Sequence, residues 1–120
     1  MIQKLEITGV HAELGDDIKK YTRKKIGKLD KYMTRNVAKS AHAEVKLKEA
    51  MRKTRKECTA EVVLHLPKET ITTKETTINM FAAVDIVEAK LKNQLKKYKE
   101  KHGNPRQIRH LLGRLGKKRP

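Results

Sequence analysis

The stretch NMFAAVDIVEAKLKNQLKKYKEK, residues 79–101, decides the fold of this 120-residue chain. Its apolar side chains recur every three or four residues, the spacing that places them on one face of an α-helix. This apolar seam consists of Met80, Val84, Val87, Leu91, Leu95 and Tyr98. Asn79 has the side chain of an N-cap, and Gly103 is typical of the position just after a helix ends. We therefore expect a long helix between these two residues, packed on a β-sheet.

Four other segments alternate between apolar and polar residues, the pattern of strands with one buried face. We expect strands at residues 1–10, at 41–47, at 58–66, and in a threonine-rich segment that opens with Ile71. The polar stretch 48–57 then joins the second and third strands as a hairpin, and its basic cluster comprises Arg52, Lys53, Arg55 and Lys56. The sequence thus predicts three consecutive strands before the long helix.

A second helix is expected over residues 14–34, because the spacing of apolar residues changes there from every second residue to about every 3.6 residues. One arc of it collects Ile18, Thr22, Ile26, Leu29 and Met33. The order strand, helix, three strands, helix predicts an α+β fold, a single β-α-β-β-β-α domain over residues 1–103 with both helices on one face of a four-stranded sheet. Residues 104–120 follow as a basic tail, for which three alternatives stay open: it frays, it orders against RNA phosphates, or it forms a short helix on a membrane surface, which its few apolar residues disfavour.

Two rows of mostly basic residues accompany the two helices. The first lysine row comprises Lys20, Lys24, Lys28, Lys31 and Arg35, and the second lysine row comprises Lys90, Gln94, Lys97 and Lys101. Steps of three and four residues place each row in a narrow arc of its helix. Like charges at this spacing repel, so folding gives no reason to align them, whereas an extended polyanion does. We expect the two rows to share one broad cationic surface suited to folded RNA.

The overall charge also favours a polyanionic partner. Lys and Arg together number 30 against 14 Asp and Glu, for a formal net charge of +16. A charge-rich surface can serve solubility alone, but this excess is larger than solubility needs and is clustered. The chain has no Trp, one Phe and three Tyr, and therefore few rings on which unpaired bases could stack. The composition favours binding through phosphate contacts.

The sequence lacks the patterns of catalytic and metal-binding sites. Its five histidines are scattered, and none has metal-ligand spacing to another histidine or to Cys58. We therefore expect no catalytic residues, no metal and no cofactor. The single cysteine, together with the lack of a long apolar run or a signal pattern, predicts a cytoplasmic protein that does not enter a membrane.

Three segments resemble the ribosome hibernation-promoting factor family, whose members are also described as ribosome-associated translation inhibitors. The segments are LEITG at residues 5–9, KKIGKLDKYM at residues 24–33, and the stretch at residues 79–101. The resemblance implies a fold related in shape to double-stranded-RNA-binding domains. It also implies binding to the small ribosomal subunit and its rRNA, in the channel between head and body. There the protein would block mRNA and tRNA at the decoding centre and inhibit translation under stress or in stationary phase.

By position, the resemblance assigns rRNA contacts to Lys25, Lys28, Lys90 and Lys97. With the two rows included, the expected RNA-binding residues are Lys20, Lys24, Lys25, Lys28, Lys31, Lys90, Lys97 and Lys101. The chain departs from the family at Asn93, where arginine is frequent. This departure removes one potential phosphate contact, for which the neighbouring Lys92 and Lys96 can compensate. Long members carry a second domain that pairs two ribosomes, and the length of this chain predicts a short-form monomer.

Two other functions stay open at this level. A general architectural or chaperone-like binder of RNA or DNA would use the same lysine rows without a preferred site. A basic enzyme acting on RNA would require turnover, which we do not expect from these residues. Charge alone does not choose between a general binder and a ribosome-specific one, and the family resemblance favours the second.

Overall fold

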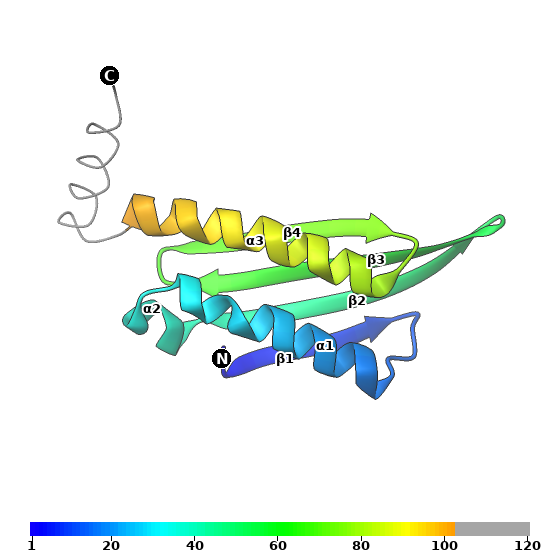
Figure 1. The fold of residues 1–120 in the computed structure, drawn as a ribbon, viewed down its shortest axis with the longest axis horizontal. Coiled ribbons are helices and arrows are strands. Elements are labelled where there is room, and N and C mark those ends of the chain that lie inside the picture. The colour runs from blue at the N-terminus through cyan, green and yellow to red at the C-terminus, as the bar shows by residue number, and fades with distance from the viewer. Residues whose placement is uncertain (103–120) are drawn as a thin grey trace, which may run out of the picture.

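The computed structural model describes residues 1–102 and has the element order expected from the sequence, with a 3-10 helix and a short α-helix added after the first helix (Figure 1). The elements are β1 (Lys4–Val10), α1 (Asp16–Gly27), the 3-10 helix η1 (Lys28–Tyr32), α2 (Arg35–Ser40), β2 (His42–Arg52), β3 (Arg55–Leu66), β4 (Glu69–Thr77) and α3 (Met80–His102). The prediction of a mixed α+β domain is confirmed. The predicted basic tail at 104–120 lies outside the described residues.

The four strands form one sheet in the order β1-β2-β3-β4. β1 runs parallel to β2, and the other two neighbouring pairs are antiparallel. The β2–β3 hairpin is longer than predicted, because pairing continues out to Arg52 and Arg55 and leaves only Lys53 and Thr54 to turn. Lys53 takes the left-handed backbone conformation, with φ of 54°. The stretch 48–57 is expected to be a connection because its strands lose the apolar alternation that marks a buried face as they extend past the first turns of α1 and α3.

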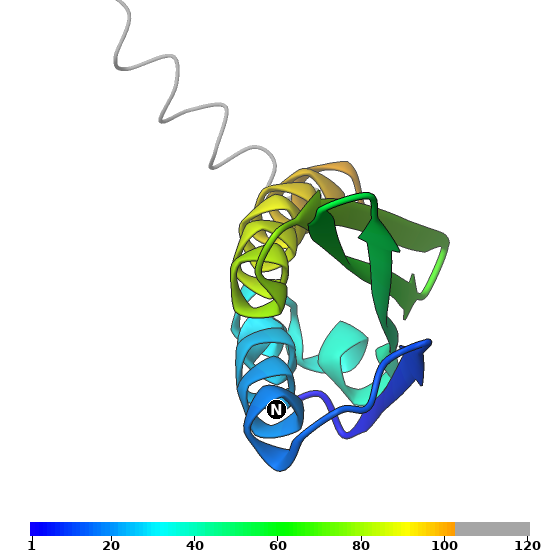
Figure 2. The ribbon, with the colours of Figure 1, turned by 90° about the vertical axis from the view of Figure 1, so that its right-hand side faces the viewer.

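Both long helices cover the same face of the sheet, as predicted (Figure 2). Every second residue of the central strands points toward the helices and is buried. These residues are Ala43, Val45, Leu47, Cys58, Ala60, Val62 and Leu64. Each residue of the α3 seam is also buried, and Leu91 is completely inaccessible. Burying a side chain of that size stabilises the fold by about 1.5–3 kcal/mol. The seam of residues 79–101 is therefore the central contact between the helix layer and the sheet.

Both ends of α3 are fixed by polar contacts. Asn79 is the N-cap expected from the sequence, because its Oδ1 accepts hydrogen bonds from the backbone N–H groups of Phe81 at 2.8 Å and Ala82 at 3.3 Å. Near the other end, the hydroxyl of Tyr98 donates to the carbonyl of Pro67 in the β3–β4 turn. These contacts fix the position of α3 along the sheet.

The first helix is shorter than predicted. The expected helix over 14–34 ends at Gly27, continues as the 3-10 turn η1, and is followed by the separate helix α2. Glycine is a poor helix former, and the carbonyl of Gly27 accepts a hydrogen bond from the N–H of Ile2 at 2.9 Å. Thr34 then caps α2 through its Oγ1, which accepts from the N–H of Val37 at 3.4 Å. Arg35 consequently belongs to another helix and not to the first lysine row.

Candidate nucleic-acid interface

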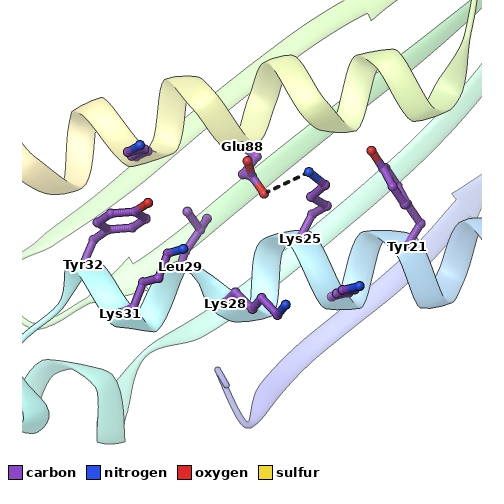
Figure 3. Close-up of a pocket in the computed structure, with 9 residues that line it drawn as sticks. Tyr21, Lys25, Lys28, Leu29, Lys31, Tyr32 and Glu88 are labelled. Carbon is purple, nitrogen blue, oxygen red and sulfur yellow. Dashed lines mark ion pairs between the residues drawn. The ribbon is translucent and has the colours of Figure 1, made fainter.

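A groove lies between the α1–η1 segment and α3, on the outer side of the helix layer (Figure 3). It encloses about 340 Å³. Its lining residues, which define the interhelical groove, are Tyr21, Lys24, Lys25, Lys28, Leu29, Lys31, Tyr32, Glu88 and Lys92. Five of these nine residues are lysines. The helices therefore bring together cations that are up to 68 positions apart in the chain.

One end of the groove is neutralised by acidic side chains of α3. Lys25 Nζ lies 3.6 Å from Asp85 Oδ1 and 4.0 Å from Glu88 Oε2. The Tyr21 hydroxyl donates to Asp85 Oδ1 at 2.5 Å, and this hydrogen bond is the main cause that raises the pKa of Tyr21 to about 12. The ring of Tyr21 also packs edge-on against Phe81, with centroids 5.0 Å apart. This end joins the two helices and has little cationic charge left for a ligand.

The other end of the groove is cationic and open. Lys31 Nζ lies 5.2 Å and Lys92 Nζ 5.3 Å from the centre of the Tyr32 ring, so two ammonium groups lie close to one aromatic ring. Desolvation alone would raise the pKa of the Tyr32 hydroxyl. The hydrogen bond with Lys92 and the charges of both lysines outweigh it, and that pKa lies below its ordinary value. Within residues 1–102, Lys24, Lys28, Lys31 and Lys92 form no ion pair with any acidic side chain.

The second lysine row occupies a different position. Lys90 Nζ pairs with Glu75 Oε2 at 2.5 Å, and Lys101 Nζ lies 4.0 Å from Glu69 Oε2. Gln94 Oε1 accepts a hydrogen bond from the hydroxyl of Thr73 at 2.6 Å. These three partners belong to β4, and Lys97 lines a hollow beside the same strand. The row therefore lies on the flank of α3 that faces β4, away from α1.

The expectation that both rows share one surface is wrong for this reason. The first row contributes Lys24, Lys28 and Lys31 to the groove, together with the neighbouring Lys25, while Lys20 is exposed on α1 outside the lining. The flank of α3 that faces α1 instead presents Asp85, Glu88 and Lys92. The second lysine row lies on one side of the apolar seam of α3. The order of the strands in the sheet decides which side of α3 faces α1 and which faces β4.

Tyr32 is not among the residues expected to bind RNA, and Lys92 is expected only as a substitute for the phosphate contact missing at Asn93. Lys92 follows the buried Leu91 directly and lies one helical turn after Glu88, which places it on the α1-facing flank. The sequence shows the spacing between Glu88 and Lys92, but it does not show that α1 lies beside this side of α3. Tyr32 is half-buried at the end of η1, a 3-10 turn that the predicted continuous helix did not contain.

The groove residues form no group of metal ligands. In the part of the chain that the structure describes, one such group exists, and it lies on the face of the sheet opposite the helices. Among the same residues, no helix combines the length and the apolarity needed to cross a bilayer.

Residues 5–103 match the model of a protein family described as sigma 54 modulation protein / S30EA ribosomal protein. The chain belongs to this family. Two curated relatives are named ribosome hibernation promotion factor. That of Lactococcus lactis subsp. cremoris (strain MG1363) is 35% identical over 96 residues, which are 80% of this chain and 49% of the relative. That of Staphylococcus aureus (strain COL) is 33% identical over 96 residues, 80% of this chain and 48% of the relative. The chain thus spans about half the length of these two proteins.

Solved structures share the fold. The N-terminal domain of Protein Y from Thermus thermophilus superposes with a TM-score of 0.66 and 27% identity, covering 78% of this chain and 94% of that domain. A ribosomal subunit interface protein from Coxiella burnetii gives a TM-score of 0.65 over 81% of this chain and 98% of the other. At 21% identity, the second likeness concerns the fold alone. Both structures agree with the α+β architecture described above.

Proposed function

We propose that this chain is a ribosome hibernation factor that binds the small ribosomal subunit and its rRNA. In this proposal it occupies the decoding channel, blocks mRNA and tRNA, and inhibits translation under stress or in stationary phase. Membership of the family and the names of the relatives support a role on the ribosome. The observation that carries the proposal is the open end of the interhelical groove, where Lys31 and Lys92 lie against Tyr32 and Lys28 lines the same groove. None of these lysines has an acidic partner in the described chain.

The charge of the groove suits a folded RNA backbone. Lysine ammonium groups neutralise phosphates and release counterions, which gives affinity without reading the base sequence. RNA helices are recognised mostly by shape and by contacts to phosphates and 2′-hydroxyls, and a groove between two helices presents cations at fixed separations. Tyr32 adds one aromatic face at the same place. The proposed contacts therefore select for folded rRNA by the spacing of charges.

Inhibition follows from occupancy and requires no catalysis. A protein seated in the channel excludes mRNA and tRNA sterically, so its effect depends on its affinity and concentration. We propose that it acts as a cytoplasmic monomer. Of the lysines expected from the sequence, Lys24, Lys28 and Lys31 belong to this proposed interface, whereas Lys25 lines the groove but is paired with Asp85 and Glu88. Lys20 extends it along α1, whereas Lys90, Lys97 and Lys101 would contact rRNA only on the β4 side of α3.

A general RNA- or DNA-binding role is the second candidate. It is favoured by cations outside the groove, because the tip of the β2–β3 hairpin and the open sheet face both carry basic side chains, among them Arg52, Lys53, Arg55, Lys46 and Lys74. A protein with positive charge on several surfaces can bind any polyanion from several sides. Such a binder would show no preference between subunits.

Competition on purified ribosomal subunits separates the two functions. The full chain is mixed with small or large subunits, with and without a large excess of an unrelated RNA duplex, and the bound fraction is measured by sedimentation. We expect the chain to sediment with small subunits and to remain bound in the presence of the duplex. Equal sedimentation with both subunits, or complete release by the duplex, would establish the general binder instead.

A further inference from the structure

The open face of the sheet carries a second cluster of polar side chains, far from the groove. His42 opens β2 and is paired directly with His65 of β3 in the antiparallel register. Glu44 lies two residues further along β2 and therefore projects from the same face as His42. Because Ala43 and Val45 are buried against the helices, all three side chains must point away from the core. They are 23 residues apart at most, and strand pairing alone brings them together.

The three side chains converge. His65 Nε2 lies 3.2 Å from Glu44 Oε2, and the rings of His42 and His65 have centroids 5.4 Å apart. One ligand atom from each residue lies within 4.8 Å of the other two. Tetrahedral coordination with bonds of about 2.0–2.1 Å places ligand atoms about 3.4 Å apart, so small rotations of the side chains complete the geometry.

We propose that His42, Glu44 and His65 form a binding site for Zn²⁺. Two imidazoles and a carboxylate are a ligand set that zinc accepts, with water completing the fourth position. The site is accessible, because the side chains of His65 and Glu44 are 43% and 44% exposed. Mg²⁺ and Ca²⁺ prefer all-oxygen ligand sets and are poor competitors here.

The site does not depend on the proposed ribosome binding. It lies on the face of the sheet that the helices leave open, whereas the interhelical groove is on the outer side of the helix layer. A bound ion would join β2 to β3 where β3 approaches its end. Since an ion that binds only the folded state stabilises it, Zn²⁺ should raise the unfolding temperature of the protein.

A second histidine–glutamate pair supplies a matched control. His102 Nε2 lies 2.9 Å from Glu69 Oε2, a contact similar to that between His65 and Glu44. Within residues 1–102 this pair has no third ligand close enough to complete a site. If a surface histidine–glutamate contact were enough to bind zinc, both pairs would bind it. If three ligands are needed, only the cluster at His42 will.

The test is titration of the full chain with Zn²⁺, measured by calorimetry in the presence of excess Mg²⁺. We expect one saturable equivalent in the wild type and in His102→Ala. Removing a residue that merely supports a metal ligand costs about 10–100-fold in affinity, so loss of a ligand itself in His65→Ala or Glu44→Gln should cost about 100-fold or more. Glu44→Gln preserves side-chain size and isolates the loss of the carboxylate.

Thermal unfolding provides a second readout on the same proteins. Zn²⁺ should raise the midpoint of wild type and His102→Ala and leave that of Glu44→Gln unchanged, while the metal-free midpoints confirm that each variant folds. The proposal is overturned if the wild type binds no stoichiometric Zn²⁺, if Glu44→Gln and His65→Ala retain wild-type affinity, or if His102→Ala loses as much affinity as they do.

Discussion

The two lysine rows have similar spacing in the sequence and different surroundings in the fold. In the first row, Lys24, Lys28 and Lys31 line the interhelical groove and have no acidic partner within residues 1–102. In the second row, Lys90 and Lys101 lie against glutamates of β4. An ammonium group already paired within the protein must give up that partner before it neutralises a phosphate. The rows therefore differ in the charge that they can offer to RNA.

This difference shows that lysine periodicity identifies a helix surface and not a binding surface. The element that lies next to each row decides whether its lysines are paired within the protein or free to bind phosphates. β4 supplies Glu69 and Glu75 beside α3, whereas the outer side of α1 meets no strand in the described part of the chain. The same comparison explains why Lys92, which belongs to neither row, is the lysine of α3 that reaches the groove.

The largest expected effect comes from neutralising the open end of the groove. In the variant Lys28→Gln/Lys31→Gln/Lys92→Gln, affinity for the small subunit should fall about 10²–10³-fold near 0.1 M salt, because each lost phosphate contact costs about tenfold. The matched control is Lys46→Gln/Lys48→Gln/Lys74→Gln on the strands, which also removes three positive charges. Sedimentation binding curves should show a loss of only a few-fold in the control. Equal losses would mean that net charge alone, and not the groove, drives binding.

Salt dependence sharpens the same comparison. With Lys24, Lys28, Lys31 and Lys92 on phosphates, affinity should fall about 10²-fold between 50 and 200 mM salt, on the scale of duplex DNA. The triple groove variant should flatten the plot of log affinity against log salt by about three units of slope. A variant of the second row, Lys97→Gln, should leave the slope nearly unchanged. An unchanged slope in the groove variant would exclude these lysines as phosphate contacts.

A smaller effect concerns stability beneath the first row. Thr22 lies on the core side of α1, is completely inaccessible, and its hydroxyl has no hydrogen-bond partner in the described chain. Replacing this unsatisfied group in Thr22→Val should raise the free energy of unfolding by about 1 kcal/mol, as measured by denaturant titration. Affinity for the small subunit should not change, because the side chain points away from the groove. A destabilised Thr22→Val would show that the hydroxyl has a bound partner such as water.

The smallest effect is expected at the paired lysine of the second row. The hydrogen bond and charge of Lys90 hold the pKa of Glu75 below its ordinary value. A carboxyl whose pKa is depressed on folding stabilises the protein above its unfolded pKa, and this contribution disappears as the pH falls through the folded pKa. Lys90→Gln should therefore lower the unfolding midpoint at neutral pH by less than about 5 °C, since exposed pairs contribute little.

In acid, the unfolding midpoints of Lys90→Gln and the wild type should converge. A difference that persists below the folded pKa of Glu75 would show that the lysine stabilises the helix by another route. The variant should also bind the small subunit with nearly wild-type affinity. A large loss of affinity would show that Lys90 contacts RNA, and the two rows would then not differ in their role.

The fold was largely predictable because its signals are local and mutually consistent. The α3 seam, the N-cap at Asn79 and the alternation of the central strands each follow from residue spacing, and all are confirmed. The end of α1 at Gly27 was missed because it depends on a hydrogen bond from Ile2, which is distant in the chain. The length of the hairpin was missed because its outer half has no buried face.

The candidate site was only partly predictable, for a different reason. Periodicity identified the lysines of α1 and η1 that line the groove, but it could not show which flank of α3 faces them. That choice depends on the strand order, which places β4 at one edge of the sheet and β1 at the other. The cluster of His42, Glu44 and His65 was missed for the same reason, since it exists only through the register of β2 and β3.

The most direct test of this account is a structure of the full chain bound to the small ribosomal subunit, determined by cryo-electron microscopy. We expect rRNA phosphates within hydrogen-bonding distance of Lys28, Lys31 and Lys92, with the open face of the sheet turned away from that contact. Density that places the open sheet face or the β4 flank of α3 against rRNA, with the interhelical groove exposed to solvent, would contradict the assignment of the groove as the binding surface.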